Sequence, residues 1–181
     1  MKCTKFVIVS DAHKYVKGFD QVLVQEPQAD YYLDLGDNFC GGKPTEFFKE
    51  TFQSVRGNND ANYFPNLVDI ELYGKKIRMV HGHLLPWGCL HDQEEMYRYM
   101  ESEHVDILLY GHTHRRVIEI NEKNQAIINP GSLSFTRDLD LRMNHQGSYC
   151  VMYLYEDGHI EAESKTIHVD MKSLQQCLLK F

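Results

Sequence analysis

Seven side chains that can bind metal ions follow short apolar runs of the sequence. Asp37 is the central candidate, because it comes directly after the strand-like run 31–35 and Gly36. Similar runs at 6–9, 54–56, 77–80 and 107–110 each precede further ligand types. In open α/β sheets ligands bind beyond the carboxyl ends of the strands, so these side chains can meet at one place. The set is Asp11, His13, Asp37, Asn58, His81, His112 and His114.

This ligand set predicts a centre of two metals. Each motif alone is common, since Asp-x-His arises by chance and Gly-Asp is a frequent turn, so the prediction depends on the whole set. Two carboxylates, one amide and four imidazoles exceed what one four-coordinate metal needs, and they suit two metals that share a carboxylate. Nitrogen and oxygen ligands without cysteine favour Mn, Fe, Co, Ni or Zn over Ca.

A pair of divalent cations also indicates the chemistry. Two such ions held by two carboxylates keep a positive local charge, which favours an anionic substrate. Metals about 3.5 to 4 Å apart can stabilise both the attacking and the leaving oxygen of an in-line displacement. A metal-bound water has a pKa lowered towards roughly 7, so hydroxide becomes available to attack phosphorus. We therefore expect phosphoryl transfer.

The order of the motifs resembles that of the calcineurin-like metallophosphoesterases. That family runs Asp-x-His, Gly-Asp, Gly-Asn-His-Asp/Glu, His and Gly-His-x-His, and this chain has counterparts of all five between Asp11 and His114. It is most similar to the small bacterial and archaeal phosphodiesterase branch, which also includes the eukaryotic retromer subunit of the same fold. The chain length, His81-Gly82-His83 and the turn 129–132 carry this likeness. The resemblance implies an α/β fold, a four-layer α-β-β-α sandwich with two mixed β-sheets.

The resemblance also implies roles for particular residues, with Asp37 as the bridge between two metal ions, manganese being the first expectation. One metal would be held by Asp11, His13, Asp37 and His114, and the other by Asp37, Asn58, His81 and His112.

Asn59 departs from the family pattern, because many members have a histidine there that an amide cannot replace as a proton donor. The small diesterase branch also tends to lack that histidine. The candidate catalytic residues are His83, Asn59 and Asp60, with Asp60 orienting a ligand. The candidate substrate-binding residues are Asn58, His83 and Arg137, although an exposed arginine or a solvent-facing histidine is an equally ordinary interpretation.

The elements that position these residues alternate at first between strand and helix, which indicates an α/β fold. Helical spacing of apolar residues over 15–23 predicts a helix that ends before Pro27, and a short helix is expected at 46–52. The region 67–80 predicts a hairpin whose turn is 73–76.

The rest of the chain is richer in strands and predicts a second sheet packed on the first. Asp92-Gln93-Glu94-Glu95 is a capping box for a helix that ends near His104. Asp170 caps a last helix, in which Leu174, Cys177 and Leu178 form an apolar stripe. The connection 135–147 has no clear period and could be a lid or an oligomer contact. Strands are expected at 117–120, 126–129, 148–155 and 160–167.

Length and composition limit the alternatives. The 181 residues suit a single domain, 1–181. The formal charge of −7 disfavours a stable nucleic-acid complex, because such surfaces gather Lys and Arg. No apolar stretch approaches the ~18 residues of a membrane span, and the N-terminal apolar run is too short for a secretory signal, so we expect a cytoplasmic protein. The five cysteines are scattered, so we expect them to be reduced thiols.

The sequence thus predicts a dinuclear metal-dependent phosphoesterase, with a phosphodiesterase favoured over a monoesterase. The substrate would be a phosphate-ester small molecule or a nucleotide, and the chain could form a homo-oligomer. The alternatives are a phosphomonoesterase that uses the same site and a non-catalytic protein-binding scaffold of the same fold, as in the retromer branch.

Overall fold

The computed structural model describes residues 2–40, 42–43, 51–86 and 88–178. Two five-stranded sheets form the centre of the molecule. The first sheet has the strand order β10-β9-β1-β2-β3. Strands β1, β2 and β3 are parallel, and β9 and β10 are antiparallel to their neighbours. The bounds are β1 Cys3–Val9, β2 Tyr31–Asp34, β3 Phe52–Ser54, β9 Gln146–Tyr155 and β10 Ile160–His168.

The second sheet has the order β4-β5-β6-β8-β7. Its three central strands β5, β6 and β8 are parallel, and the outer strands β4 and β7 are antiparallel to them. Both sheets are therefore mixed, each with three parallel strands whose carboxyl ends reach one edge. The bounds are β4 Leu67–Leu72, β5 Lys75–Val80, β6 Ile107–Tyr110, β7 Arg116–Ile120 and β8 Ala126–Pro130.

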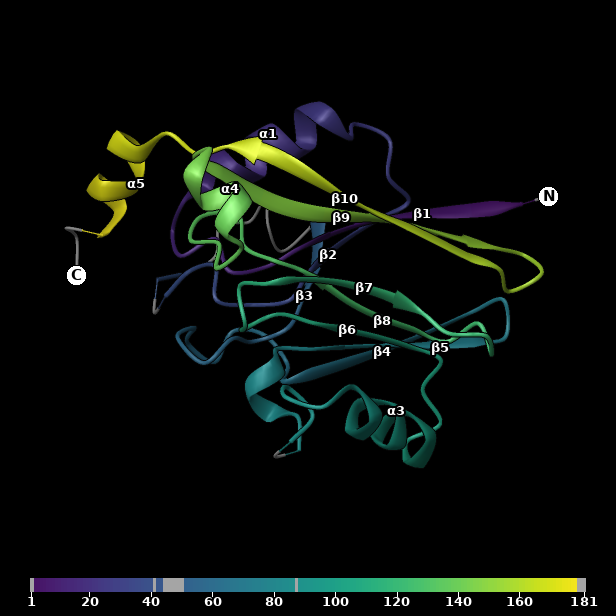
Figure 1. Ribbon diagram of the computed structural model, residues 1–181. Helices are drawn as coiled ribbons and strands as arrows, with labels where there is room; N and C mark the ends of the chain where they lie inside the picture. The colour runs from purple at the N-terminus through teal and green to yellow at the C-terminus, as the bar shows by residue number, and fades with distance from the viewer. Residues whose placement is uncertain (1, 41, 44–50, 87, 179–181) are drawn as a thin grey trace.

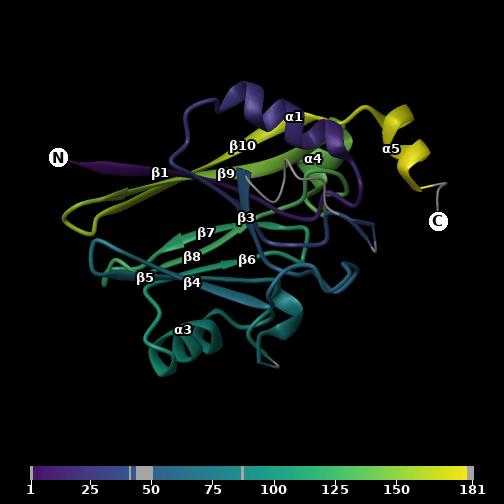
Figure 2. The same ribbon diagram turned by 180° about the vertical axis from the view of Figure 1, so that it is seen from behind.

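Figures 1 and 2 show the two sheets stacked face to face, with helices outside them. Helix α1 (Val16–Gln25) lies over the first sheet, and α3 (Gln93–Ser102) lies over the second. Helices α4 (Leu139–Met143) and α5 (Met171–Leu178) lie at the end of the sandwich opposite the N-terminus. The expected four-layer α-β-β-α sandwich is confirmed.

Alternation along the strands explains the layers, because successive strand residues point to opposite faces. In β1, Phe6 and Ile8 belong to the core between the sheets, whereas Val7 and Val9 pack with Phe19 of α1 on the outer face. The outer face of the second sheet packs against α3 in a third cluster, in which Met96 and Met100 of α3 lie with Val80 and Leu108. Strands buried on both faces read as continuous apolar runs, as β6 does.

The expected helix at 15–23 is confirmed as α1, and the helix after the capping box is confirmed as α3. The backbone N–H of Glu94 donates to the side chain of Asp92 at 2.9 Å, which caps α3. In α5, Asp170 accepts from the backbone N–H of Lys172 at 3.1 Å, and Leu174 is buried. None of the helices in the described ranges is long and apolar enough to cross a membrane.

The structure differs from several expectations about the elements. The third strand is Phe52–Ser54 and not 54–56, because Tyr32 pairs with Phe52 and Asp34 with Ser54. Of the helix expected at 46–52, Phe52 belongs to this strand, Thr51 is helical, and 46–50 lie outside the described residues. The hairpin turn is only Tyr73-Gly74, both with positive φ, which suits the twist of a two-residue turn.

The connection 135–147 contains the short helix α4, which is too brief to give a visible period. The last two strands do not belong to the second sheet. Strand β9 pairs with β1, with Cys3 opposite Tyr155, and β10 extends the same sheet. Pairing between strands so far apart in sequence leaves no local pattern, so the sequence could not assign these strands to a sheet.

Candidate metal centre

Parallel strands deliver the seven candidate ligands to one edge of the sandwich. Asp11 and His13 follow β1, Asp37 follows β2, and Asn58 follows β3 in the first sheet. In the second sheet, His81 follows β5, and His112 and His114 follow β6. Contacts across the two sheets show that the loops meet: Nε2 of His13 lies 3.1 Å from Nε2 of His114.

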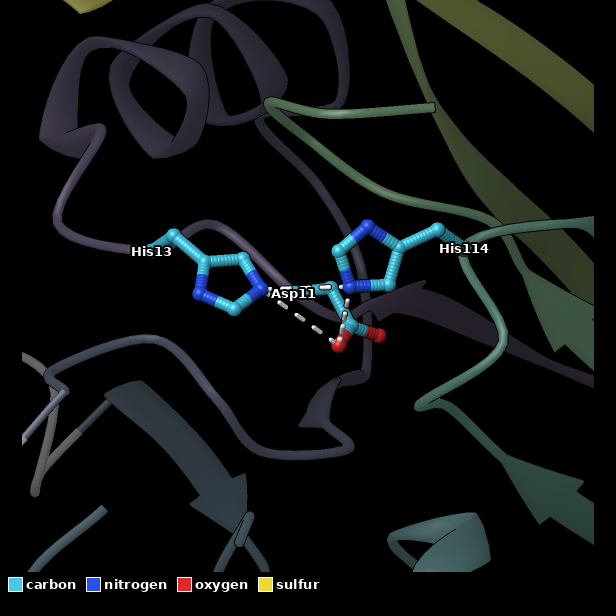
Figure 3. A group of neighbouring side chains, drawn as sticks. All are labelled: Asp11, His13 and His114. Atoms are coloured by element: carbon cyan, nitrogen blue, oxygen red, sulfur yellow. Dashed lines mark hydrogen bonds and ion pairs between the residues drawn. The ribbon is translucent and has the colours of Figure 1, made fainter. Parts of the chain in front are cut away.

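The first group consists of Asp11, His13 and His114, whose ligand atoms all lie within 4.8 Å of one another. Figure 3 shows the two imidazoles facing each other beside the Asp11 carboxylate. Oδ1 of Asp11 lies 3.1 Å from Nε2 of His114 and 3.9 Å from Nε2 of His13. Asp11 is fully buried, and the two histidine side chains keep only 17% and 15% exposure.

The second group consists of Asp37, His81 and His112, again within 4.8 Å. Nε2 of His81 lies 3.4 Å from Oδ2 of Asp37 and 3.2 Å from Oδ1 of Asn58. His81 is completely buried, whereas Asn58 is exposed. The structure therefore brings all seven candidates into two adjacent groups. The bridging role expected of Asp37 stays a prediction.

Hydrogen bonds fix which ring nitrogen of two histidines faces each group. Nδ1 of His114 lies 2.5 Å from the carbonyl oxygen of Phe135, and Nδ1 of His81 lies 2.6 Å from that of Leu35. A carbonyl only accepts, so each Nδ1 carries a proton, and Nε2 of each ring faces the carboxylate opposite it. Histidine ligands of metals are commonly held in this way.

The Asp11 carboxylate has unmet acceptor capacity in the first group. Oδ1 of Asp11 is buried and, within the described residues, accepts no hydrogen bond, even though Nε2 of His114 is close. A lone pair facing a carboxylate oxygen in a buried site is unfavourable unless a proton or a cation lies between them. The donor set fits divalent transition metals, because it combines imidazole nitrogen with carboxylate and amide oxygen.

The close contact between imidazole and carboxylate also shifts the pKa values in the second group. Burial favours the neutral form of His81, but the contact with Asp37 and the negative charges of Asp11 and Asp37 outweigh it and raise its pKa. Burial would raise the pKa of Asp37, but the contact with His81 and two hydrogen bonds from Asn59 lower it well below its usual range. His112 has a lowered pKa because of burial and the charge of His81. Asp37 is thus held as the anion.

The ligand loops hold strained backbone. Five of the seven candidates have positive φ, a region that non-glycine residues rarely adopt: Asp11, His13, Asp37, His112 and His114. Such conformations persist only where surrounding contacts impose them, and they concentrate at functional sites. Here the loops after β1 and β2 are joined by backbone hydrogen bonds, including His13 N–H to Asp37 O at 2.9 Å.

Asp60 and Asn59 both hold Asp37. The carboxylate of Asp60 accepts from the backbone N–H groups of Asp37 at 2.7 Å and Gly57 at 3.1 Å, and also from Phe39 and Cys40. Asn59 donates to Asp37 from its backbone at 2.7 Å and from its side chain at 2.5 Å. Asn59 orients the carboxylate of Asp37 directly, and Asp60 holds the backbone that carries it; the orienting role expected of Asp60 stays a prediction.

The remaining candidates lie around the groups. Nδ1 of His83 lies 2.9 Å from the carbonyl oxygen of His81, and its ring stands 6.1 Å from that of His112. Burial and the charge of His81 lower the pKa of His83. Arg137 is exposed and its backbone N–H donates to the carbonyl of His114 at 2.9 Å, so it lies beside the first group.

The sequence interpretation missed Cys40, which was taken as a packing residue. Its Sγ lies 3.3 Å from Nδ1 of His13, so it is the partner of the ring nitrogen that faces away from the first group. Burial and nearby carboxylates raise the pKa of Cys40 to about 12, so it stays a thiol. Its spacing after Asp37 gave no signal, because no Cys-x-x-Cys pattern surrounds it.

Fold and site together define a two-sheet sandwich with a cluster of His, Asp and Asn side chains at the carboxyl ends of its parallel strands. A profile of the calcineurin-like phosphoesterase superfamily domain matches residues 4–157. The chain therefore belongs to the calcineurin-like phosphoesterase superfamily. A search of curated proteins finds no match.

Solved structures with the same fold come from bacteria, archaea and eukaryotes. A predicted phosphoesterase from Streptococcus pneumoniae has a TM-score of 0.69 at 21% identity, covering 92% of this chain and 99% of that one. Vps29 from Entamoeba histolytica, complexed with Zn²⁺, has a TM-score of 0.65 at 22% identity, covering 90% and 99%. An archaeal phosphodiesterase has a TM-score of 0.58 at 20% identity, covering 90% and 100%. At these identities the likeness shows the fold alone.

Proposed function

We propose that the chain is a dinuclear metal-dependent phosphodiesterase that acts on a small phosphate ester or a nucleotide. One observation carries the proposal: Nε2 of His114 and Nε2 of His81 face the carboxylates of Asp11 and Asp37 in two adjacent groups. The residues would hold two divalent ions, with Asp11, His13 and His114 at the first site, Asn58, His81 and His112 at the second, and Asp37 bridging both. Manganese is the first candidate, with Fe, Co, Ni and Zn as alternatives.

When bound, such ions supply Lewis acidity and lower the pKa of water so that it can attack phosphorus. The chain's own residues provide the rest. Asn59 and Asp60 hold Asp37 as an oriented anion, and the Nδ1 contacts of His81 and His114 fix both rings. We assign Asn58 and Arg137, which are both exposed, to substrate binding, where the guanidinium of Arg137 would bind a non-bridging oxygen.

A diester is favoured over a monoester because the small diesterase branch, which this chain resembles, also tends to lack the proton-donating histidine. Asn59 stands where a proton-donating histidine would be, and His83 uses its Nδ1 proton on the carbonyl of His81. A non-catalytic protein-binding scaffold, by contrast, does not require seven coordinating side chains. Burying them without a ligand would cost about 1 to 3 kcal/mol for each unpaired polar group.

The test is reconstitution of the purified protein. Protein freed of metal by chelation is loaded with Mn²⁺ and assayed with bis(p-nitrophenyl) phosphate and p-nitrophenyl phosphate. We expect diester hydrolysis that chelator abolishes and that His112→Ala lowers at least about 10²-fold. Faster hydrolysis of the monoester would assign a phosphomonoesterase. Folded protein that binds Mn²⁺ and hydrolyses neither ester would favour the scaffold.

A further inference from the structure

A sixth strand end reaches the edge where the ligand loops meet. Strand β8 runs parallel to β6, so the residues after it lie beside the loop 111–114. We call residues 129–135 the support segment. It contributes no candidate ligand, yet Asn129, Ser132 and Leu133 are completely buried. Buried polar side chains that are not ligands need hydrogen-bond partners, and the partners of these residues identify what the segment does.

Ser132 holds the first metal site from two directions. Its hydroxyl donates to the carbonyl oxygen of Asp11 at 2.8 Å, next to a second such bond from Ser134 at 2.9 Å. The same Ser132 oxygen accepts from the backbone N–H of Phe135 at 2.9 Å. The carbonyl of Phe135 in turn accepts the Nδ1 proton of His114 at 2.5 Å. One buried hydroxyl thus connects two candidate ligands of the first site.

Asn129 holds the loop that carries His112 and His114. Its amide nitrogen donates to the carbonyl of Gly111 and to the hydroxyl of Thr113, both at 3.0 Å, and its oxygen accepts from the backbone N–H of Gly131 at 2.9 Å. Both amide protons are used. Because His112 belongs to the second group and His114 to the first, this amide supports one ligand of each site.

The loop has little freedom to adjust without these bonds. A Cβ on Gly111 would overlap the hydroxyl of Ser10, so the backbone at 111 is in close contact with the loop after β1. The backbone N–H of His112 also donates to Oδ2 of Asp11 at 2.9 Å. Asp11, His112 and His114 all have positive φ, a strained conformation that depends on such contacts.

We propose that Ser132 and Asn129 are positioning residues for the metal centre, with Ser132 acting on the first site and Asn129 on both sites. The proposal depends on the two metal sites proposed above. Residues that hold metal ligands in this way commonly change metal affinity 10- to 100-fold when replaced. Ser132 and Asn129 are not candidate ligands, so any effect they have on metal affinity acts through the ligands that they hold.

The experiment titrates Mn²⁺ into the full-length protein by calorimetry, one site at a time. The His81→Ala background isolates the first site, and the His13→Ala background isolates the second. We expect Ser132→Ala to weaken Mn²⁺ binding roughly 10- to 100-fold at the first site and to leave the second unchanged. We expect Asn129→Ala to weaken both sites, and Ser132→Thr, which keeps the hydroxyl, to restore the first.

Ser148→Ala is the matched control. Ser148 is equally buried and its hydroxyl donates to Pro130 of the support segment at 2.7 Å, but its bond does not reach a ligand loop. It should lower thermal stability without changing Mn²⁺ affinity. The positioning proposal fails if Ser148→Ala weakens Mn²⁺ binding as much as Ser132→Ala, or if folded Ser132→Ala and Asn129→Ala bind two Mn²⁺ as the wild type does.

Failure of Ser132→Ala to fold and failure of the wild type to bind Mn²⁺ are the two remaining outcomes. If Ser132→Ala does not fold, Ser134→Ala replaces it, because that variant removes only one bond to the same Asp11 carbonyl. A several-fold loss of Mn²⁺ affinity at the first site of Ser134→Ala supports the proposal. Wild-type Mn²⁺ affinity in Ser134→Ala overturns it. If the wild-type protein itself binds no Mn²⁺, the proposed function fails as well. Two bound Mn²⁺ in the wild type with unaffected variants reject the positioning role alone.

Discussion

Gly57 lies so close to the carboxylate of Asp37 that a Cβ atom at position 57 would overlap both Oδ1 and the backbone nitrogen of Asp37. One oxygen of Asp60 accepts from the backbone N–H groups of both residues, at 3.1 Å and 2.7 Å. The loops after β2 and β3 are therefore in direct contact. Asp37 and Asn58 can lie this close only because Gly57 has no side chain.

Gly57→Ala should therefore displace Asp37 and disturb the second metal site. We expect a loss of roughly 1 to 3 kcal/mol in unfolding free energy, the usual cost of overpacking, together with weaker Mn²⁺ binding. Gly74→Ala is the control, since its φ is +75° but no atom lies within 4 Å of a Cβ there. It should cost about 1 kcal/mol and leave Mn²⁺ binding unchanged. Urea unfolding and calorimetric Mn²⁺ titration measure both effects; equal Mn²⁺ affinities would contradict the prediction.

Replacing Asp37 should affect the metals differently from replacing Asn58. If Asp37 bridges the two metal ions, Asp37→Ala loses both of them. Asn58→Ala loosens only the ion of the second site, because the side chain of Asn58 contacts His81 among the candidate ligands. Metal analysis after dialysis counts the ions bound per chain. Asn62→Ala, an exposed amide in the same loop, is the control and should retain two. Two equivalents retained by Asp37→Ala would show that the bridging assignment is wrong.

The hydrolysis rate should depend steeply on the leaving group. Without an acid at Asn59, the departing oxygen leaves as an anion, so aryl diesters should react faster than alkyl ones. A series of phosphodiesters with varied leaving-group pKa measures this slope under conditions where chemistry limits turnover. Asn59→His should flatten the slope by supplying an acid, and Asn59→Ala should keep it. A flat slope in the wild type would indicate that another group, such as His83, protonates the leaving oxygen.

Stability should depend on pH through Glu26, far from the metal centre. Its carboxylate is 4% exposed and contacts Nζ of Lys5 at 2.6 Å and of Lys165 at 2.7 Å. Burial would raise the pKa of Glu26, but hydrogen bonds from Lys165, Lys5 and Tyr149 outweigh it and lower the pKa below its ordinary 4.5. The folded state therefore binds this proton less readily than the unfolded chain. The stabilisation is complete above about pH 4.5 and is lost as the pH falls through the lowered value.

Glu26→Gln should cost roughly 2 to 3 kcal/mol at pH 7, somewhat less than a fully buried pair because both lysines are partly exposed. The difference from the wild type should shrink as the pH falls below 4.5. Glu163→Gln is the matched control, since Glu163 also contacts Lys165 but is 56% exposed, and it should change stability by less than about 1 kcal/mol. Denaturant titrations across pH measure both variants. A pH-independent difference for Glu26→Gln would contradict the prediction.

The sequence by itself determined the ligand types and their strand-end positions. Asp11, Asp37 and His81 each follow an apolar run, and parallel strands of a sheet deliver their carboxyl ends to one edge, the first two residues in the first sheet and His81 in the second. The capping box at Asp92 and the helix before Pro27 were equally readable, because caps and proline act within one turn. These features depend on neighbours in the chain, so local sequence carries them.

The tertiary structure decided what depends on distant partners. Only folding shows that β9 pairs with β1, that Nδ1 of His114 meets the carbonyl of Phe135, and that Cys40 stands behind His13. The turn at 129–132 looked like an ordinary connection, yet its buried Asn129 and Ser132 bond to loops that begin at residues 111 and 10. These hydrogen bonds join residues 18 to 121 positions apart, and such a bond constrains neither residue type nor spacing enough to be read from one sequence.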